Sequence, residues 1–136
     1  MQYVSFPGHP LPVSRICLGT MMFGDKCDGA LSEAIVARAL ELGINAFDTA
    51  AMYSAGASEQ YLARALKSQP RDQLFVTTKV VKGIDRRSIL ESIDESLARL
   101  QMDYVDLYLI HWPVVGMNLT DMMAGLNDVV AAGKNR

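Results

Sequence analysis

The sequence has few cysteines, few histidines and no long apolar run. Its two cysteines, Cys17 and Cys27, are too few for a disulfide framework and lack the spacing of zinc ligands. We expect Cys17 to be a small buried residue and Cys27 to be a thiol in a loop. The two histidines, His9 and His111, form no HxH pair, which argues against a metal site built from several histidines. We therefore predict no metal centre.

The charge and hydropathy of the sequence argue against membranes and nucleic acids as partners. No apolar stretch approaches the roughly 18 residues of a membrane-spanning helix, and no basic segment precedes an apolar one at the N-terminus. With 13 Lys and Arg against 15 Asp and Glu, the net charge is -2, which gives no reason to expect nucleic acid or an anionic membrane as partner. We expect a soluble cytoplasmic protein whose 136 residues, 50% of them hydrophobic, form one domain.

What the sequence contains is a regular alternation of strand-like and helix-like segments. Turn residues at 7–10 separate two short runs within 2–14, which predicts an N-terminal β-hairpin with an exposed His9. Four strand–helix units follow it. Strands are predicted at 15–20, 44–48, 74–79 and 104–111, and each is followed by an amphipathic helix. The expected N-terminal residues of the helices are Ser32, Ser58, Asp85 and either Asn118 or Thr120.

The apolar positions of these helices are spaced three to four residues apart, so each helix is expected to bury one face. The predicted buried residues are Ile35, Ala39 and Leu42, then Leu62 and Leu66, then Ile89, Ile93, Leu97 and Leu100, and finally Met122, Leu126 and Val129. The neighbouring Met123 is also expected in the core, because methionine fills irregular gaps there.

This alternation predicts an α/β fold with a parallel sheet. Strands begin about every 30 residues, which is the length of one unit of a (β/α)8 TIM barrel. A doubly wound sheet is the competing architecture, but it usually carries a GxGxxG loop after its first strand, and residues 19–24 do not fit that pattern. We therefore predict about four βα units, or half a barrel, preceded by the hairpin.

Four ionisable side chains end or follow the predicted strands. Asp48 ends the second strand, and Tyr53 lies in the loop after it. Lys79 ends the third strand and His111 the fourth. Because the carboxyl ends of parallel barrel strands open on one face, we expect these side chains to lie together. Each one alone also has a structural explanation, namely a turn cap, a half-buried aromatic, a surface lysine and a core histidine.

This set of groups suits proton transfer to a carbonyl oxygen. A phenol has a pKa of about 10 and is a poor acid at neutral pH, but a nearby ammonium stabilises the phenolate. A carboxylate keeps the ammonium charged and in place, and a neutral imidazole can donate a hydrogen bond to the substrate oxygen. Since no side chain donates a hydride, a reduction requires a nicotinamide cofactor.

Three stretches resemble the aldo-keto reductase family. They are GINAFDTAAMYSAGASEQYLARAL at 43–66, DYVDLYLIHWP at 103–113 and VSRICLGTMMFG at 13–24. The resemblance implies a catalytic tetrad, with the tyrosine as general acid. The matching residues are Asp48, Tyr53, Lys79 and His111.

The resemblance also implies the ligands of the site. It implies NADP(H) as cofactor, and the residues expected near its nicotinamide half are Gly19, Thr20, Met21 and Asp48. It implies reduction of aldehydes or ketones, with the small carbonyl substrate beside Tyr53, His111 and Trp112. A packed aromatic at the rim is the alternative reading of Trp112.

The sequence departs from the family pattern at two residues and in length. Ser54 and Ala63 stand where the family often has glycine, and we expect both changes to be mild. Family members are roughly twice as long, so residues 1–136 are expected to be a single N-terminal portion of the barrel, truncated after the fourth unit. The exposed sheet edges would favour self-association. The alternative function is an inactive half-barrel, or a nucleotide-binding or regulatory protein on this scaffold.

Overall fold

The computed structural model describes residues 1–80, 85–113 and 115–136. An antiparallel hairpin of β1 (Tyr3–Val4) and β2 (Val13–Ser14) precedes a four-stranded parallel sheet whose order is β3-β4-β5-β6. The sheet strands are β3 (Cys17–Gly19), β4 (Ala46–Asp48), β5 (Phe75–Val80) and β6 (Leu107–Ile110). Neighbours in the chain are thus neighbours in the sheet.

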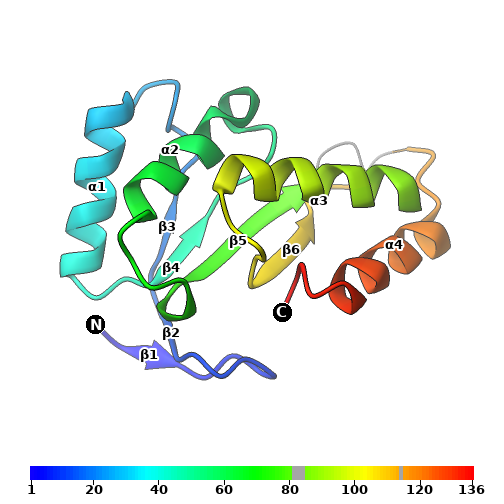
Figure 1. The fold of residues 1–136 in the computed structure, drawn as a ribbon, viewed down its shortest axis with the longest axis horizontal. Coiled ribbons are helices and arrows are strands. Elements are labelled where there is room, and N and C mark those ends of the chain that lie inside the picture. The colour runs from blue at the N-terminus through cyan, green and yellow to red at the C-terminus, as the bar shows by residue number, and fades with distance from the viewer. Residues whose placement is uncertain (81–84, 114) are drawn as a thin grey trace.

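Helices alternate with the strands and lie side by side on one face of the sheet (Figure 1). They are α1 (Gly29–Glu41), α2 (Ala57–Leu66), α3 (Arg86–Leu100) and α4 (Leu119–Ala131), with the short 3₁₀ helices η1 (Tyr53–Gly56) and η2 (Arg71–Gln73). A doubly wound sheet would place helices on both faces. The prediction of a parallel α/β half-barrel with an N-terminal hairpin is confirmed. No helix in the described ranges has the length and apolarity needed to span a membrane.

The main core lies between the sheet and the helices, because alternate strand residues point to opposite faces. The strands contribute Phe47, Val76, Val80 and Tyr108, all buried. A smaller cluster of Val13, Ala46 and Phe75 lies apart from this core, with Leu11 and Leu107 packed against it. Since Leu11 and Val13 belong to the hairpin segment, the hairpin covers the strands near their starts and leaves their carboxyl ends open.

Helix α3 follows its sequence signals closely. The Asp85 carboxylate accepts a hydrogen bond from the Ser88 amide, and the Ser88 hydroxyl in turn accepts one from the Asp85 amide, which forms a capping box. All four predicted core residues of this helix are buried, as are Leu62 and Leu66 of α2. In α4, Asn118 rather than Thr120 is the N-cap, and its side chain accepts a hydrogen bond from the Asp121 amide.

Helix α1 differs from its prediction in both its start and its buried face. It begins at Gly29, because Asp28 supplies the N-cap by accepting a hydrogen bond from the Leu31 amide. Ser32 is therefore inside the helix, where it is buried with Val36 and Ala39. Of the predicted buried face, Ala39 is buried and Ile35 is partly buried against the core, so spacing identified this face in part. Leu42, predicted to be in the core, is 51% exposed.

Two further predictions about single side chains are wrong. Cys17 is exposed, because its position on β3 alternates with Leu18 and points away from the helices, while Cys27 is half-buried. Met122 is buried but Met123 is 52% exposed. Adjacent helical residues point about 100° apart, so one narrow core-facing stripe takes only one of them.

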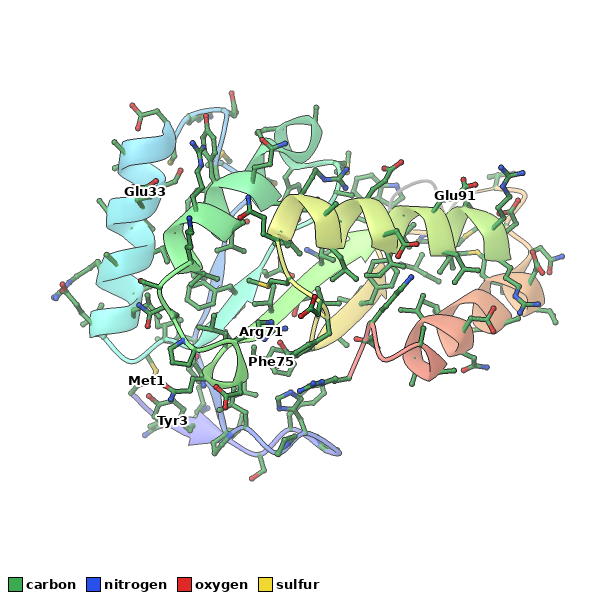
Figure 2. The ribbon with its side chains drawn as sticks, viewed as in Figure 1. Met1, Tyr3, Glu33, Arg71, Phe75 and Glu91 are labelled. Atoms are coloured by element: carbon green, nitrogen blue, oxygen red, sulfur yellow. The ribbon has the colours of Figure 1, made fainter. Side chains whose placement is uncertain are left out.

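His9 is also wrongly predicted, because its side chain is only 8% exposed. Its Nε2 lies 3.0 Å from Asp106 Oδ1, and its ring packs edge-on against Phe75 with centroids 5.1 Å apart. Arg71 Nη2 donates to the other carboxylate oxygen of Asp106 at 2.7 Å. Figure 2 shows Arg71 and Phe75 close together at the end of the sheet that faces the hairpin. The hairpin turn is thus tied to the beginning of β6.

Candidate active site

Lys79 is the centre of the polar cluster at the carboxyl ends of the strands. It lies on β5, two residues beyond Thr77, which is the register partner of Asp48 on β4. Lys79 Nζ donates to Asp48 Oδ2 at 2.6 Å, to the Thr49 carbonyl at 2.8 Å and to the Tyr53 hydroxyl at 3.3 Å. An ammonium has three donors, and here each has a protein acceptor, so the ammonium of Lys79 is held in one position.

Tyr53 reaches Lys79 from the loop that follows β4. It is the first residue of η1, and its amide donates to the Ala50 carbonyl at 3.1 Å, so the loop turns back toward the sheet. Lys79 Nζ lies 5.0 Å from the centroid of the Tyr53 ring, in addition to its contact with the phenol oxygen. The side chain of Lys79 is 13% exposed. The phenol is therefore held against a cation that is largely shielded from water.

His111 approaches the same tyrosine from the neighbouring strand. Its amide donates to the Val80 carbonyl at 3.0 Å, which continues the ladder between β5 and β6. Its ring meets the Tyr53 ring edge-on with centroids 5.5 Å apart, and stacks at a tilt on Trp112 with centroids 4.0 Å apart. Burial, and next the positive charge of Lys79, lower the pKa of His111 below its ordinary value of 6.5. The imidazole is therefore neutral at pH 7.

A cavity of about 540 Å³ opens beside Tyr53 and His111. Four lining residues come from the segments after β3 and β4 and were not predicted as site residues. They are Gly24, Asp25, Met52 and Ser54, and Asp25 contributes an exposed carboxylate. The lining residues are Met21, Gly24, Asp25, Met52, Tyr53, Ser54, His111 and Trp112. Of the predicted ligand-contact residues, Met21 and Trp112 therefore share a cavity with the tyrosine and the histidine.

Gly19 and Thr20 lie beside Asp48 but differ in environment. Gly19 is exposed and pairs with Asp48 across β3 and β4, and a Cβ added to it would meet no atom within 4 Å. Thr20 is fully buried. Its amide and its hydroxyl both donate to the Asp48 carbonyl, at 2.9 and 3.1 Å. Gly19 thus faces open space, whereas Thr20 is engaged within the protein.

The loop after Tyr53 has an unusual backbone. Ser54, Ala55 and Gly56 have φ values of 50°, 53° and 91°, so three successive residues are left-handed. Only glycine adopts this region without strain, so Ser54 and Ala55 each carry a conformational cost. A Cβ at Gly56 would lie 2.7 Å from Arg99 Cδ, which explains glycine at that position. The departure at Ser54, expected to be mild, places a side chain in a strained conformation next to the catalytic candidate.

Ser58 was predicted to cap α2, but Gly56 is the N-cap residue and Ser58 is fully buried inside the first turn. Its hydroxyl donates to the Thr20 carbonyl at 2.8 Å and lies 2.8 Å and 3.0 Å from the hydroxyls of Thr20 and Thr49. Sequence spacing could have indicated this burial, because Ser58 lies four residues before Leu62 on the same helical face.

A family model described as the aldo/keto reductase family matches residues 15–136. Over 150 residues the chain is 33% identical to aldo-keto reductase YhdN of Bacillus subtilis (strain 168), covering 100% of this chain and 45% of that protein. Over 134 residues it is 39% identical to protein tas of Escherichia coli (strain K12), covering 83% of this chain and 39% of that protein. The chain thus spans less than half the length of these relatives.

Solved structures agree with these matches. The thermostable aldo-keto reductase Tm1743, in complex with the inhibitor epalrestat, superposes with a TM-score of 0.92 at 30% identity, covering 100% of this chain and 52% of that one. An aldo-keto reductase from Klebsiella pneumoniae in complex with NADPH superposes with a TM-score of 0.82 at 31% identity, covering 92% of this chain and 44% of that one. The fold, the family model and the relatives agree, and the chain belongs to the aldo/keto reductase family.

Proposed function

We propose that this chain carries the acid–base half of an NADP(H)-dependent site that reduces aldehydes or ketones to alcohols. The observation that carries the proposal is the contact of Lys79 Nζ with both the Asp48 carboxylate and the Tyr53 hydroxyl. A lysine exposed at the surface would donate to water, whereas Lys79 donates to three acceptors from β4 and the loop that follows it. An ammonium that is fixed beside a phenol is what proton donation to a carbonyl oxygen requires.

Tyr53 is the proposed general acid. As the carbonyl oxygen gains negative charge, the phenol Oη–H gives its proton to that oxygen and becomes a phenolate. Lys79, held by Asp48, stabilises this phenolate through its contact at 3.3 Å with Oη. The carboxylate holds the ammonium of Lys79 in place through a contact of 2.6 Å. Asp48 therefore acts through Lys79 and not on the substrate.

His111 is the proposed hydrogen-bond donor that orients the carbonyl. Its Nδ1 is buried and has no hydrogen-bond partner among the residues that the structure describes. We assign the proton of the neutral ring to Nε2, where a substrate oxygen can accept it. Trp112 and Met52 line the same cavity and give it apolar walls for the remainder of the substrate. The neutral ring donates a hydrogen bond without competing with Tyr53 for the transferred proton.

NADP(H) is the proposed cofactor, and it supplies the hydride that reduces the carbonyl carbon. The residues proposed to lie against its nicotinamide half are Gly19, Thr20, Met21 and Asp48. The open space over Gly19 supports this assignment, because a flat ring can approach the backbone there beside Asp48. One relative of known structure was solved with NADPH, which supports the choice of cofactor.

Turnover of a reactive aldehyde tests the proposal. We expect this chain to oxidise NADPH in the presence of 4-nitrobenzaldehyde, followed by the loss of absorbance at 340 nm. Tyr53→Phe removes only the acid hydroxyl, and general acid catalysis contributes roughly 100- to 10,000-fold, so the rate should fall by that factor. Calorimetric titration should show that the variant binds NADPH as the wild type does. A rate that is absent in the wild type, or unchanged in Tyr53→Phe, would refute the proposal.

A further inference from the structure

We propose that Ser58 is a positioning residue that aligns Lys79 with Tyr53 through the backbone of Asp48 and Thr49. This inference rests on the proposed function, because it assigns a part of the same site. Among the described residues, Ser58 forms no side-chain hydrogen bond with Lys79 and does not line the cavity, and its side chain is fully buried. Its effect on the reaction must therefore pass through the residues that it bonds.

The first step of the argument is the hydrogen-bond capacity of the hydroxyl. A serine hydroxyl has one donor and two acceptor positions. Ser58 donates to the Thr20 carbonyl and can accept from the Thr49 hydroxyl, and the single proton of the Thr20 hydroxyl is shared between Ser58 Oγ and the Asp48 carbonyl. Its capacity is therefore matched by partners from the ends of two neighbouring strands. Among the described residues of α2, only Ser58 forms side-chain hydrogen bonds with both of these threonines.

The second step is what those threonines hold. The Thr49 carbonyl accepts a hydrogen bond from Lys79 Nζ at 2.8 Å. The Thr20 amide and hydroxyl both donate to the carbonyl of Asp48, whose carboxylate accepts from Lys79 at 2.6 Å. The Asp48 carboxylate at the end of β4 and the Thr49 carbonyl just beyond it are therefore connected to the Ser58 hydroxyl, the first through Thr20 and the second through the side chain of Thr49.

The third step is the residue next to Ser58, which fixes the strand that carries the lysine. Glu59 is fully buried, and its Oε1 accepts a hydrogen bond from the Thr78 hydroxyl at 2.7 Å. Arg99 of α3 donates to the other oxygen of Glu59, which balances the buried charge. Thr78 immediately precedes Lys79 on β5. The first turn of α2 therefore holds the strand of Lys79 through Glu59, and it holds the acceptors of Lys79 through the preceding residue, Ser58.

The fourth step is the tyrosine. Tyr53 begins η1, and the left-handed residues 54–56 that complete it lead directly into α2. A shift of the first turn of α2 would move the phenol relative to the ammonium. Small displacements of a reacting group can reduce a rate by up to about 100-fold. Ser58 thus fixes the relative positions of donor and cation, whereas packing of Leu62 and Leu66 only fixes the helix against the core.

The test combines a signal that needs no turnover with a kinetic measurement. In ¹H–¹⁵N spectra selective for lysine side chains, the Lys79 ammonium should give a slowly exchanging signal, assigned by its loss in Lys79→Met. Ser58→Ala should abolish or broaden that signal. It should lower kcat by between about 10- and 100-fold, with the KM for aldehyde unchanged. Ser68→Ala, the same change at an exposed serine, should alter neither measurement.

Two further results keep the inference separate from stability and from the proposed function. If Ser58→Ala fails to give a folded amide spectrum, Thr49→Val replaces it, because it removes the bonded hydroxyl at nearly constant volume and should have the same effects. In the double variant, the two losses should not add. An unaltered lysine signal and kcat in a folded variant would overturn the inference. A wild type without turnover would refute the proposed function, while the lysine signal would still decide the role of Ser58.

Discussion

The imidazole ring of His111 meets the phenol ring of Tyr53 edge-on, at an interplanar angle of 84°. This contact places the histidine within the electric field of Lys79, whose positive charge is the second cause, after burial, of the lowered pKa of His111. The chain has two histidines, so the titration of each can be followed separately by NMR.

We predict that His111 titrates below its ordinary pKa of 6.5 and that Lys79→Met raises the midpoint. The variant removes a positive charge that disfavours the imidazolium, while the negative charge of Asp48, which favours it, remains. The measurement is the proton chemical shift of the two imidazole rings against pH, with His9→Gln for assignment. Lys67→Met, at an exposed lysine, should leave the midpoint in place. An unchanged or lower midpoint in Lys79→Met would contradict the prediction.

The lowered pKa of His111 also determines the direction in which the free energy of unfolding changes with pH. Because the folded state disfavours protonated His111, the unfolded chain binds more protons between the lowered pKa and about 6.5. The contribution of His111 to the free energy of unfolding is therefore complete above about pH 6.5 and is lost as the pH falls through the lowered folded-state pKa. Urea unfolding at several pH values should show a weaker acid dependence in His111→Gln.

Ser54→Gly should stabilise the fold by about 0.5–1 kcal/mol, because it relieves a left-handed residue at a smaller cost in chain entropy. The φ of Ser54 is 50°, and the position is one where the family often has glycine. Ala98→Gly, which removes a Cβ from an exposed position inside α3, serves as control and should destabilise by about 1 kcal/mol. Thermal or urea unfolding measures both. Destabilisation by Ser54→Gly would show that its backbone is not strained.

Asp106→Asn should lower the free energy of unfolding by about 2–3 kcal/mol, because it leaves the half-buried guanidinium of Arg71 without its counter-ion and weakens the bonds of a buried carboxylate. The carboxylate bonds His9, Arg71 and the Val76 amide, and its side chain is 2% exposed. Asp103→Asn, three residues earlier and exposed, should change stability by less than about 0.5 kcal/mol. Equal effects of the two substitutions in urea unfolding would show that the buried cluster does not stabilise the fold.

The features that sequence spacing predicted well are those governed by local chemistry. Asp85 and Asn118 cap helices through hydrogen bonds within one turn. The apolar stripe of α3 is buried because its spacing matches the helical period of 3.6 residues. The four ionisable side chains gather because parallel strands must end on one face. Their placement required only the correct order of strands and helices.

The features that the sequence did not reveal depend on contacts between distant segments. His9 has the surroundings of a turn residue, and nothing nearby in the sequence indicates a bond to Asp106. Serine is a residue type that often caps helices, but Gly56 is the N-cap of α2, because its left-handed backbone directs the chain from the loop into the helix. In both cases the hydrogen-bond partner of the polar side chain lies on another strand or loop, and local patterns do not identify that partner.

The bond between His9 and Asp106, which joins residues 97 positions apart, also has a consequence for synthesis. The hairpin leaves the ribosome before the strands of the sheet, and its partner carboxylate is translated 97 residues after His9. At about 5–20 residues per second, the hairpin waits roughly 5–20 seconds before that bond can form. Each βα unit can meanwhile pack on its predecessor, so the His9–Asp106 bond closes only after the first three strands of the sheet have been made.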